Sequence, residues 1–261
     1  MLKAYKYRIY PTVAQKKQLA HHFGCARWVY NWALDSTKKH YEVYKKQLSR
    51  KELQQRLVAL KRTENHAWLK EVNSQALLSS LLHLHTAYNA FFKKKARFPT
   101  FKKKHNRQSY QCPQHVTIDI KKEILQLPKI KNLKIKLHRV FNGNIKTVTI
   151  SQTPSGKYFA SVLVENSQQV PTSLPFDAQK TVGIDLGLTH FAITRHGEKI
   201  NAPKYLKSNL VKLGIAQKER ARKKKNAYNY KKKSIEVAKI DEKVARSRYD
   251  FIQAIHPKVS A

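Results

Sequence analysis

The chain has 261 residues, of which 53 are Lys or Arg and 16 are Asp or Glu, so its formal net charge is +37. A protein this basic repels itself unless a polyanion neutralises it, and we therefore predict a nucleic-acid partner. No apolar run approaches the roughly 20 residues of a membrane-spanning helix, which argues against a membrane protein, and a start without signal-peptide character leads us to expect a cytoplasmic location. Cys25 and Cys112 are far apart and form no Cys-x-x-Cys pair, so neither a disulfide framework nor a zinc site is expected.

The first part of the chain is predicted to form one strand followed by helices. Residues 5–10 alternate in polarity and end at a proline, which indicates a β-strand. A helix should begin near Thr12, because the apolar positions that follow step by three and four: Leu19, Phe23, Ala26, Tyr30 and Ala33. Similar steps predict a second helix over residues 53–60 and a third after Asn73, so residues 12–95 should form a small helical bundle.

The first predicted helix carries candidate nucleic-acid contacts. A cation, several aromatic rings and an amide follow closely in its sequence, as Arg27, Trp28, Tyr30, Asn31 and Trp32. Such residues suit base stacking and phosphate contact. The alternative is that the aromatic rings simply fill the core of the bundle, and the sequence leaves both interpretations open.

A stretch without any acidic residue follows the bundle, over residues 93–104. Its cations are interleaved with two phenylalanines, as Lys93, Lys94, Lys95, Arg97, Phe98, Phe101, Lys102, Lys103 and Lys104. This composition is typical of a loop that follows a phosphate backbone while its rings meet bases or sugars. A merely solvated loop is the alternative, but so concentrated a positive charge is costly without a counter-charge.

From about Ser109 the hydrophobic pattern has a period of two, which predicts a sheet. Strands are expected over residues 116–120, 124–127, 133–137, 146–152 and 157–165, the last two joined by a hairpin turn at 154–156. Short strands at this spacing indicate a small barrel or curled sheet. Its outward positions should carry the cations Lys121, Lys122, Lys129, Lys131, Lys134, Lys136, Arg139 and Lys146. A polar linker is expected over residues 166–175.

Asp185 lies in an apolar run over residues 181–186, which should form an antiparallel meander with 191–195 and 198–201. A glycine at position 183 and another at 187 would let a metal or a backbone come close to it. Asp185 is therefore a candidate ligand of a divalent cation held against phosphate oxygens. The alternative is an Asp that caps the turn after a buried strand.

A cluster of nine cations marks the last part of the chain: Lys218, Arg220, Arg222, Lys223, Lys224, Lys225, Lys231, Lys232 and Lys233. Leucines at 206, 210 and 213 precede it, and apolar residues at helical spacing follow it from Val237 onward. This pattern predicts one long helix with basic middle turns, suited to clamp a nucleic-acid duplex. An exposed segment with solvated lysines is the alternative.

The order of five motifs gives the chain a family resemblance. They are Tyr-Lys-Tyr-Arg-Ile-Tyr-Pro at 5–11, Phe-Gly-Cys-Ala-Arg-Trp-Val-Tyr-Asn at 23–31, Phe-Pro-Thr-Phe-Lys at 98–102, Val-Gly-Ile-Asp-Leu-Gly-Leu at 182–188 and Arg-Ser-Arg-Tyr-Asp-Phe at 246–251. Together they resemble the OrfB/TnpB proteins of bacterial insertion sequences, over residues 1 to about 252. Any one of these motifs alone would be weak.

The resemblance implies an α+β multidomain protein. Residues 1–10 and 108–176 would form a wedge-like, oligonucleotide-binding β-barrel, and residues 11–107 an inserted helical recognition lobe of helix-turn-helix type. Residues 177–261 would form the first half of a nuclease domain of the RuvC type, with the ribonuclease H fold and a long basic helix.

The resemblance also implies a function. Members of the family bind a guide RNA, read a short motif on duplex DNA and cut the opened strands in their RuvC site. By position, Asp185 would be the first catalytic carboxylate, and its role would be to bridge two Mg²⁺ ions. Guide RNA and duplex DNA would be the partners, and transposition the process served.

The end of the chain departs from the family pattern. The family uses a Glu and a second Asp from later strands, and commonly a Cys-x-x-Cys zinc ribbon, all of which would follow residue 252. Asp241, Glu242 and Asp250 fall on a predicted surface helix and are poor substitutes. We therefore expect an early stop or frameshift in a longer gene, a poorly packed nuclease half and deficient cleavage. The alternative is an RNA- or DNA-binding module or repressor without nuclease activity.

Overall fold

The structure is a computed structural model that describes residues 1–105, 107–167 and 182–259, with side chains to residue 255. The chain divides into two compact units, Met1–Gln169 and Val170–Ala261. Most of the linker predicted at 166–175 lies outside the described residues.

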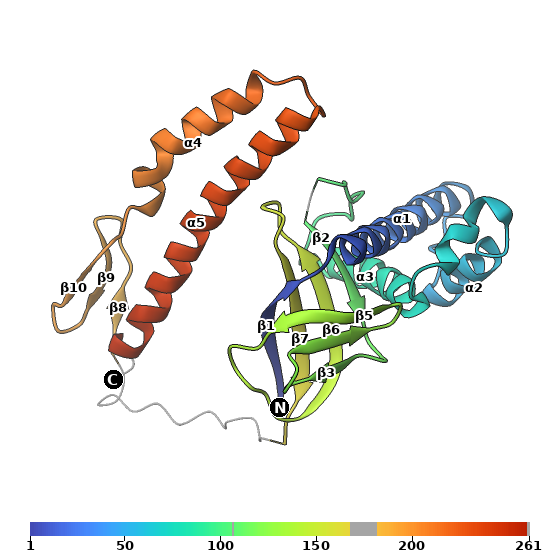
Figure 1. Cartoon of the computed structure of the whole chain (residues 1–261), viewed down its shortest axis with the longest axis horizontal. Helices are drawn as coiled ribbons and strands as arrows, with labels where there is room; N and C mark the ends of the chain where they lie inside the picture. Colours follow the sequence, from blue (N-terminus) through green and yellow to red (C-terminus); the bar gives the residue numbers. More distant parts are fainter. Residues whose placement is uncertain (106, 168–181, 260–261) are drawn as a thin grey trace. The chain divides into compact units, whose positions relative to one another are not determined.

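The first unit contains a curled, antiparallel sheet of seven strands (Figure 1). The strands are β1 (Leu2–Tyr10), β2 (Gln108–Cys112), β3 (Thr117–Asp119), β4 (Ile124–Leu127), β5 (Ile130–Lys136), β6 (Asn144–Gln152) and β7 (Tyr158–Glu165), in the order β2-β6-β7-β1-β5-β4-β3. The amino-terminal strand β1 therefore lies inside the sheet, between β7 and β5. The sheet confirms all six strands predicted for this part of the chain within a few residues, whereas β2 was not predicted as a separate strand.

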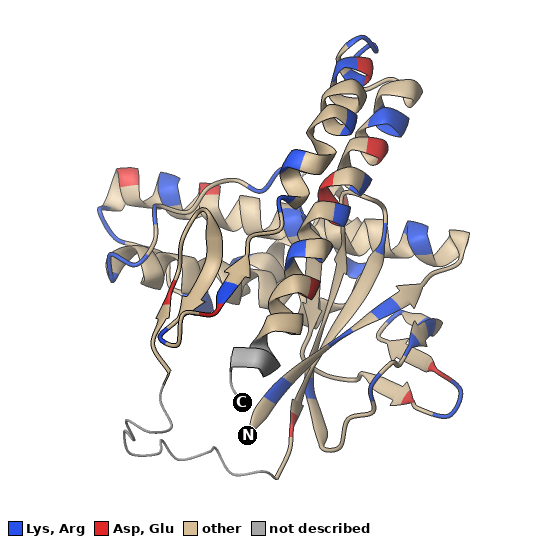
Figure 2. Ribbon diagram, turned by 90° about the vertical axis from the view of Figure 1, so that its left-hand side faces the viewer, with Lys and Arg blue, Asp and Glu red and all other residues tan. Residues whose placement is uncertain are grey.

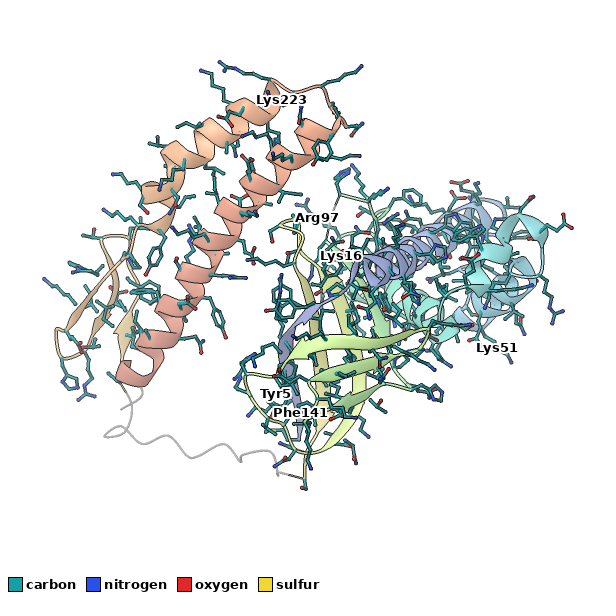
Figure 3. The ribbon with its side chains drawn as sticks, in the orientation of Figure 1. Tyr5, Lys16, Lys51, Arg97, Phe141 and Lys223 are labelled. Atoms are coloured by element: carbon teal, nitrogen blue, oxygen red, sulfur yellow. The ribbon has the colours of Figure 1, made fainter. Side chains whose placement is uncertain are left out.

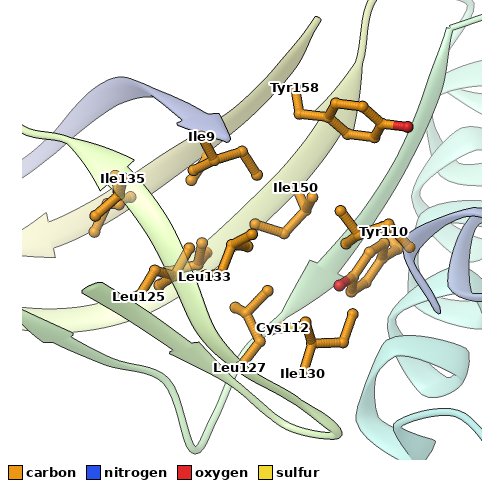
Figure 4. Packing of buried hydrophobic residues seen from close by; sticks show 14 of the residues in the cluster. Ile9, Tyr110, Cys112, Leu125, Leu127, Ile130, Leu133, Ile135, Ile150 and Tyr158 are labelled. Atoms are coloured by element: carbon orange, nitrogen blue, oxygen red, sulfur yellow. The ribbon is translucent and has the colours of Figure 1, made fainter. Parts of the chain in front are cut away.

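The core of this sheet follows from the alternation of apolar residues along its strands. Ile9, Leu133, Ile135, Ile150 and Val162 are all at most 1% exposed and pack together in one cluster (Figure 4). Because successive side chains of a strand point to opposite faces, the intervening residues face outward. All eight cations predicted for the outward positions are exposed. The hairpin turn between β6 and β7 is also confirmed, by paired backbone hydrogen bonds between Thr153 and Lys157 and between Gly156 and Thr153.

The helical part of the first unit lies between β1 and β2. It comprises α1 (Val13–Tyr44), α2 (Arg50–Leu60), a 3₁₀-helix (Glu64–Lys70) and α3 (Ser74–Phe92). The predicted bundle is confirmed, and the 3₁₀-helix is an addition. Thr12 caps α1 in a capping box with Gln15, and Ser49 caps α2 in the same way with Glu52, which satisfies amide groups at each helix start.

The second unit begins with a small antiparallel meander of β8 (Ile184–Asp185), β9 (His190–Thr194) and β10 (Lys199–Asn201), as predicted. Two helices follow, α4 (Tyr205–Ala221) and α5 (Tyr228–Val259), and they pack against each other as a hairpin (Figure 1). The prediction of one long helix was wrong. The chain leaves the helical conformation between residues 221 and 228, where Asn226 adopts a φ of 68°, a left-handed conformation that asparagine tolerates better than most residues.

The contact between α4 and α5 is partly apolar and partly ionic. Ala216, Val237 and Val244 are buried, and the Lys233 ammonium lies 2.6 Å from a Glu219 carboxylate oxygen and 2.8 Å from Glu236. The hydrogen bond to Glu219, followed by that to Glu236, raises the pKa of Lys233 to about 12. No helix within the described ranges is long and apolar enough to cross a membrane.

Candidate nucleic-acid interface

The acid-free segment at 93–104 is fixed to the helical bundle by its aromatic rings. Phe98 meets the ring of Phe91 edge-on at 5.2 Å and that of Tyr88 at 5.6 Å. The Lys38 ammonium of α1 lies 5.2 Å from the ring centroids of both Phe98 and Phe101. Aromatic contacts thus hold the backbone of the segment, while its cations Lys93, Lys94, Lys95, Arg97, Lys103 and Lys104 are exposed.

Asn31 binds this segment through both atoms of its side-chain amide. Its Nδ2 donates to the Lys102 carbonyl at 3.0 Å, and its Oδ1 accepts from the Lys102 N–H at 2.8 Å. The Lys102 ammonium lies 4.0 Å from the ring centroid of Tyr30, where desolvation lowers its pKa. Tyr30 is only 6% exposed and belongs to the core of the bundle. Asn31 and Tyr30 therefore position the basic segment.

Arg27 connects the helical bundle to the sheet. Its Nη1 donates to Oε1 of Gln108, the first residue of β2, at 2.5 Å. Arg27 is half-buried and lines two separate hollows in the surface. It lies between them, so its guanidinium can contact a ligand that enters either one.

The first hollow is an aromatic groove of 790 Å³, lined by Trp28, Trp32, Trp68 and Phe101 with Arg27 and Lys104 among its polar residues. The Trp28 and Trp32 rings lie nearly parallel, at an interplanar angle of 4° with centroids 6.2 Å apart. Trp68 meets Trp28 edge-on at 5.4 Å. The sequence pointed to Trp28 and Trp32, whose spacing of four puts them on one helical face, but it gave no sign of Trp68.

The second hollow is a basic pocket of 260 Å³ with no carboxylate among its lining residues. Its positively charged or titratable side chains are Arg27, His83, Lys102, Lys103 and Arg107. His83 shares a hydrogen bond of 3.0 Å with Gln111, and burial followed by the charge of Lys102 lowers its pKa. Such a pocket suits an anion, because every ionic side chain in it is basic. Sequence reasoning missed Arg107 and His83 as lining residues.

The turn between α4 and α5 is a third concentration of positive charge. Arg222, Lys223, Lys224 and Lys225 are all exposed there, whereas Arg220 is half-buried on α4. Figure 2 shows this turn as a basic tip, and Lys223 lies on it in Figure 3. Figure 3 also labels Tyr5 and Phe141, two aromatic residues that pack together at the sheet with ring centroids 5.6 Å apart.

Asp185 is exposed at the end of β8, which pairs with β9 alone among the described strands. Within residues 1–105, 107–167 and 182–259, no three His, Cys, Asp or Glu side chains gather as metal ligands would. Glu242 on α5 contacts Arg246 on the same helix, at 2.5 Å. Two-metal catalysis needs several carboxylates to fix the ions, so the described residues do not fit the Mg²⁺ pair that the family resemblance implies. No cleavage step follows from them.

Two family profiles match the chain. A helix-turn-helix domain of the OrfB proteins of IS605 elements matches residues 1–46, and the OrfB_IS605 profile, described as "Probable transposase", matches residues 161–260. The two matches lie at opposite ends of the chain and name the same kind of protein.

Curated relatives extend the likeness over the whole chain. A "Putative RNA-guided DNA endonuclease" of Streptomyces pristinaespiralis is 32% identical over 98% of this chain and 64% of its own length. The "Putative RNA-guided DNA endonuclease InsQ" of Escherichia coli K12 is 29% identical over 99% of this chain and 63% of its length. The chain thus spans slightly less than two thirds of each of these relatives.

Two further similarities are more limited. The "Virulence protein VsdF" of Salmonella dublin is 38% identical over 41% of this chain and 98% of its own length. A solved structure titled as a Cas12f1–sgRNA–target DNA complex covers 99% of this chain and 71% of the other, with 13% identity and a TM-score of 0.32. The matched profiles at both ends and the curated relatives along the whole length lead to one conclusion: the chain belongs to the OrfB/TnpB family of insertion-sequence proteins.

Proposed function

We propose that this chain binds a guide RNA and duplex DNA, as part of a transposon-encoded, RNA-guided DNA endonuclease system. One observation carries the proposal. The acid-free segment at 93–104 is held on the bundle by Asn31 and Lys38, while the cations of the segment on either side of these contacts are exposed. A fixed backbone with exposed cations loses little conformational freedom when it binds phosphates. Two relatives, each named as a "Putative RNA-guided DNA endonuclease", support this function.

We assign the parts of the chain to this function as follows. Residues 1–10 and 108–176, which contain the seven-stranded sheet, serve as an oligonucleotide-binding wedge, and residues 11–107 serve as a recognition lobe. Residues 177–261 belong to a nuclease domain of the RuvC type, in which the basic α4–α5 turn contacts the nucleic-acid backbone. The exposed cations of the sheet face and of the turn support these assignments.

We propose Asp185 as the carboxylate on which DNA cleavage depends wherever cleavage occurs. Mg²⁺ is the cofactor that the family implies, but among the described residues no three His, Cys, Asp or Glu side chains gather as metal ligands would. Nucleic-acid binding is therefore the part of the function that the described side chains support.

The test measures binding and cleavage separately. Fluorescence anisotropy with labelled guide RNA should give tight binding. Replacing Lys93, Lys94 and Lys95 together by Ala should make the dependence of log K for RNA binding on log salt concentration less steep, with the magnitude of its slope reduced by up to about 3. Replacing the exposed cations Lys16, Lys17 and Lys51 instead is the matched control for loss of charge. An equal effect of both triple variants would contradict a specific role for the segment.

The cleavage arm uses guide RNA, target duplex and Mg²⁺. Nicking that disappears in Asp185→Ala would assign cleavage to this residue. Nicking that persists in Asp185→Ala would refute our proposal for Asp185, and it would leave the proposal of nucleic-acid binding unaffected.

A further inference from the structure

The aromatic groove and the basic pocket meet at the same short stretch of chain. Residues 101–104 line both hollows, since Phe101 and Lys104 line the groove while Lys102 and Lys103 line the pocket. Asn31 pins this stretch at Lys102 by two hydrogen bonds. Arg27 lines both hollows. The two hollows are therefore neighbouring parts of one surface.

The groove offers preformed faces for a flat, apolar ligand. The edge-on contact with Trp68 and the ring of His66, 5.2 Å away, hold Trp28 in place. The Trp68 indole N–H donates to the Asn65 carbonyl at 3.1 Å, which fixes that ring as well. Phe101 is 45% exposed at the rim of the groove. Rigid aromatic surfaces of this kind bind nucleobases by stacking.

The pocket offers the complementary chemistry for a phosphate. Lys103 and Arg107 are exposed, and no acidic side chain lines the pocket. The groove does contain Asp35, but its carboxylate lies 2.8 Å from the Lys39 ammonium, so that charge is offset. An aromatic cleft beside a basic pocket matches a nucleotide, in which the base and the phosphate are joined through the sugar.

We propose that this surface binds one unpaired nucleotide of a single-stranded segment, with its base against Trp32 and Phe101 and its phosphate at Lys103 and Arg107. The nucleotide must be unpaired, because the faces of paired bases inside a duplex are already stacked on their neighbours. Arg27, between the two hollows, contacts the sugar-phosphate link. This inference rests on the proposed function and adds to it a site for single strands.

The three tryptophans make the site directly observable. The chain has 3 Trp residues, and all of them line the groove. Intrinsic tryptophan fluorescence of the full chain therefore reports on this groove. A short single-stranded oligouridylate should quench it saturably, whereas the same strand made of abasic nucleotides should bind through its phosphates without quenching. A blunt duplex of equal length should also leave it unquenched.

Variants test which residues form the site. Phe101→Ala should weaken oligouridylate binding roughly tenfold, the size expected for one lost stacking partner, and Trp32→Leu should remove part of the quenching. Tyr41→Ala is the matched control, since Tyr41 is an exposed aromatic residue of α1 that lines neither hollow. Lys103→Ala should weaken the binding of the normal and the abasic strand alike.

The outcomes separate this inference from the function on which it rests. Anisotropy that shows binding of guide RNA, with no quenching or with equal quenching by the abasic strand or the duplex, would overturn the site and leave the proposed function standing. Absence of any nucleic-acid binding would overturn both. Parallel titrations with single-stranded RNA and single-stranded DNA show whether the nucleotide comes from the guide or from an opened DNA strand.

Discussion

Asn31 illustrates how a residue can be identified from sequence while its role is not. The motif around it indicated a surface for nucleic acid, and the structure places it at the basic segment. Its amide, however, is engaged with the Lys102 backbone as both donor and acceptor. The amide group presents a donor and an acceptor side by side, which matches the N–H and C=O of one backbone residue, and the partner lies 71 residues further along the chain, which no local pattern encodes.

Replacing Asn31 should loosen the basic segment. Asn31→Ala removes both hydrogen bonds, so we expect a loss of about 1–2 kcal/mol in the free energy of unfolding and faster hydrogen exchange of the Lys102 amide. Asn31→Asp keeps the acceptor for that amide, so the Lys102 amide should exchange more slowly in this variant than in the alanine variant. Equal exchange rates in all three chains would show that the clamp does not hold the segment.

His22 is a buried group that the sequence did not single out. Its Nδ1 donates to the Gln18 carbonyl at 2.9 Å, and its Nε2 accepts from the Asn73 amide at 3.4 Å, an arrangement that requires the neutral ring. Burial lowers the pKa of His22, although the Gln18 bond acts in the opposite direction, and the charges of His21 and Lys129 lower it further. Protonation would also remove the acceptor for Asn73.

The lowered pKa of His22 predicts acid sensitivity. Because the folded-state pKa lies below the ordinary value of about 6.5, the neutral ring supports the fold fully above that pH, and this support is lost as the pH falls through the folded-state pKa. Urea unfolding at stepped pH should therefore show stability decreasing below about pH 6.5. In His22→Gln this part of the decrease should be absent, and an unchanged pH dependence in that variant would contradict the assignment.

At the scale of elements, local periodicity predicted most of the first unit. The sheet strands, α1 and α3 repeat their apolar residues at regular intervals, so their positions follow from the sequence. The α4–α5 break does not, because the apolar stripe resumes after the cations, as it would in one continuous helix. Only part of the aromatic groove could be predicted from the sequence. Trp68 lies in a 3₁₀-helix and Phe101 in a loop, where no periodic pattern indicates that they share a surface.

The meander of the second unit should be much less stable than the seven-stranded sheet. Strand β8 has two residues, pairs on one side and is exposed, whereas β7 pairs along its length with β6 and β1. We expect the amides of β8 to exchange with solvent orders of magnitude faster than those of Ala160 and Val162 in β7. Mass-spectrometric exchange on the full chain measures both. Exchange as slow in residues 182–193 as in β7 would refute the prediction.

For the molecule as a whole, the distribution of charge matters more than the total. Several acidic residues form ion pairs with basic neighbours, as Glu123 does with Lys136 and Glu165 with Lys146. These pairs are solvent-exposed and contribute little to stability, but they leave the remaining cations concentrated in the basic segment and in the α4–α5 turn. Although the net charge of +37 belongs to the whole chain, the positive potential is therefore strongest where the surface has no carboxylate to offset the cations.

This arrangement predicts opposite effects of salt on the free chain and on its complexes. Raising NaCl from about 0.01 M to about 0.15 M shortens the Debye length from about 30 Å to about 8 Å, which weakens self-repulsion and should raise the Tm of the free chain. The same change should weaken RNA binding steeply, because the entropy gained by each counterion released from the RNA falls as the salt concentration of the solution rises. Differential scanning fluorimetry and anisotropy in the same buffers measure the two effects. A Tm that falls with salt would mean that attractive ion pairs outweigh repulsion among the cations, and the case for a polyanionic partner would then lose its electrostatic basis.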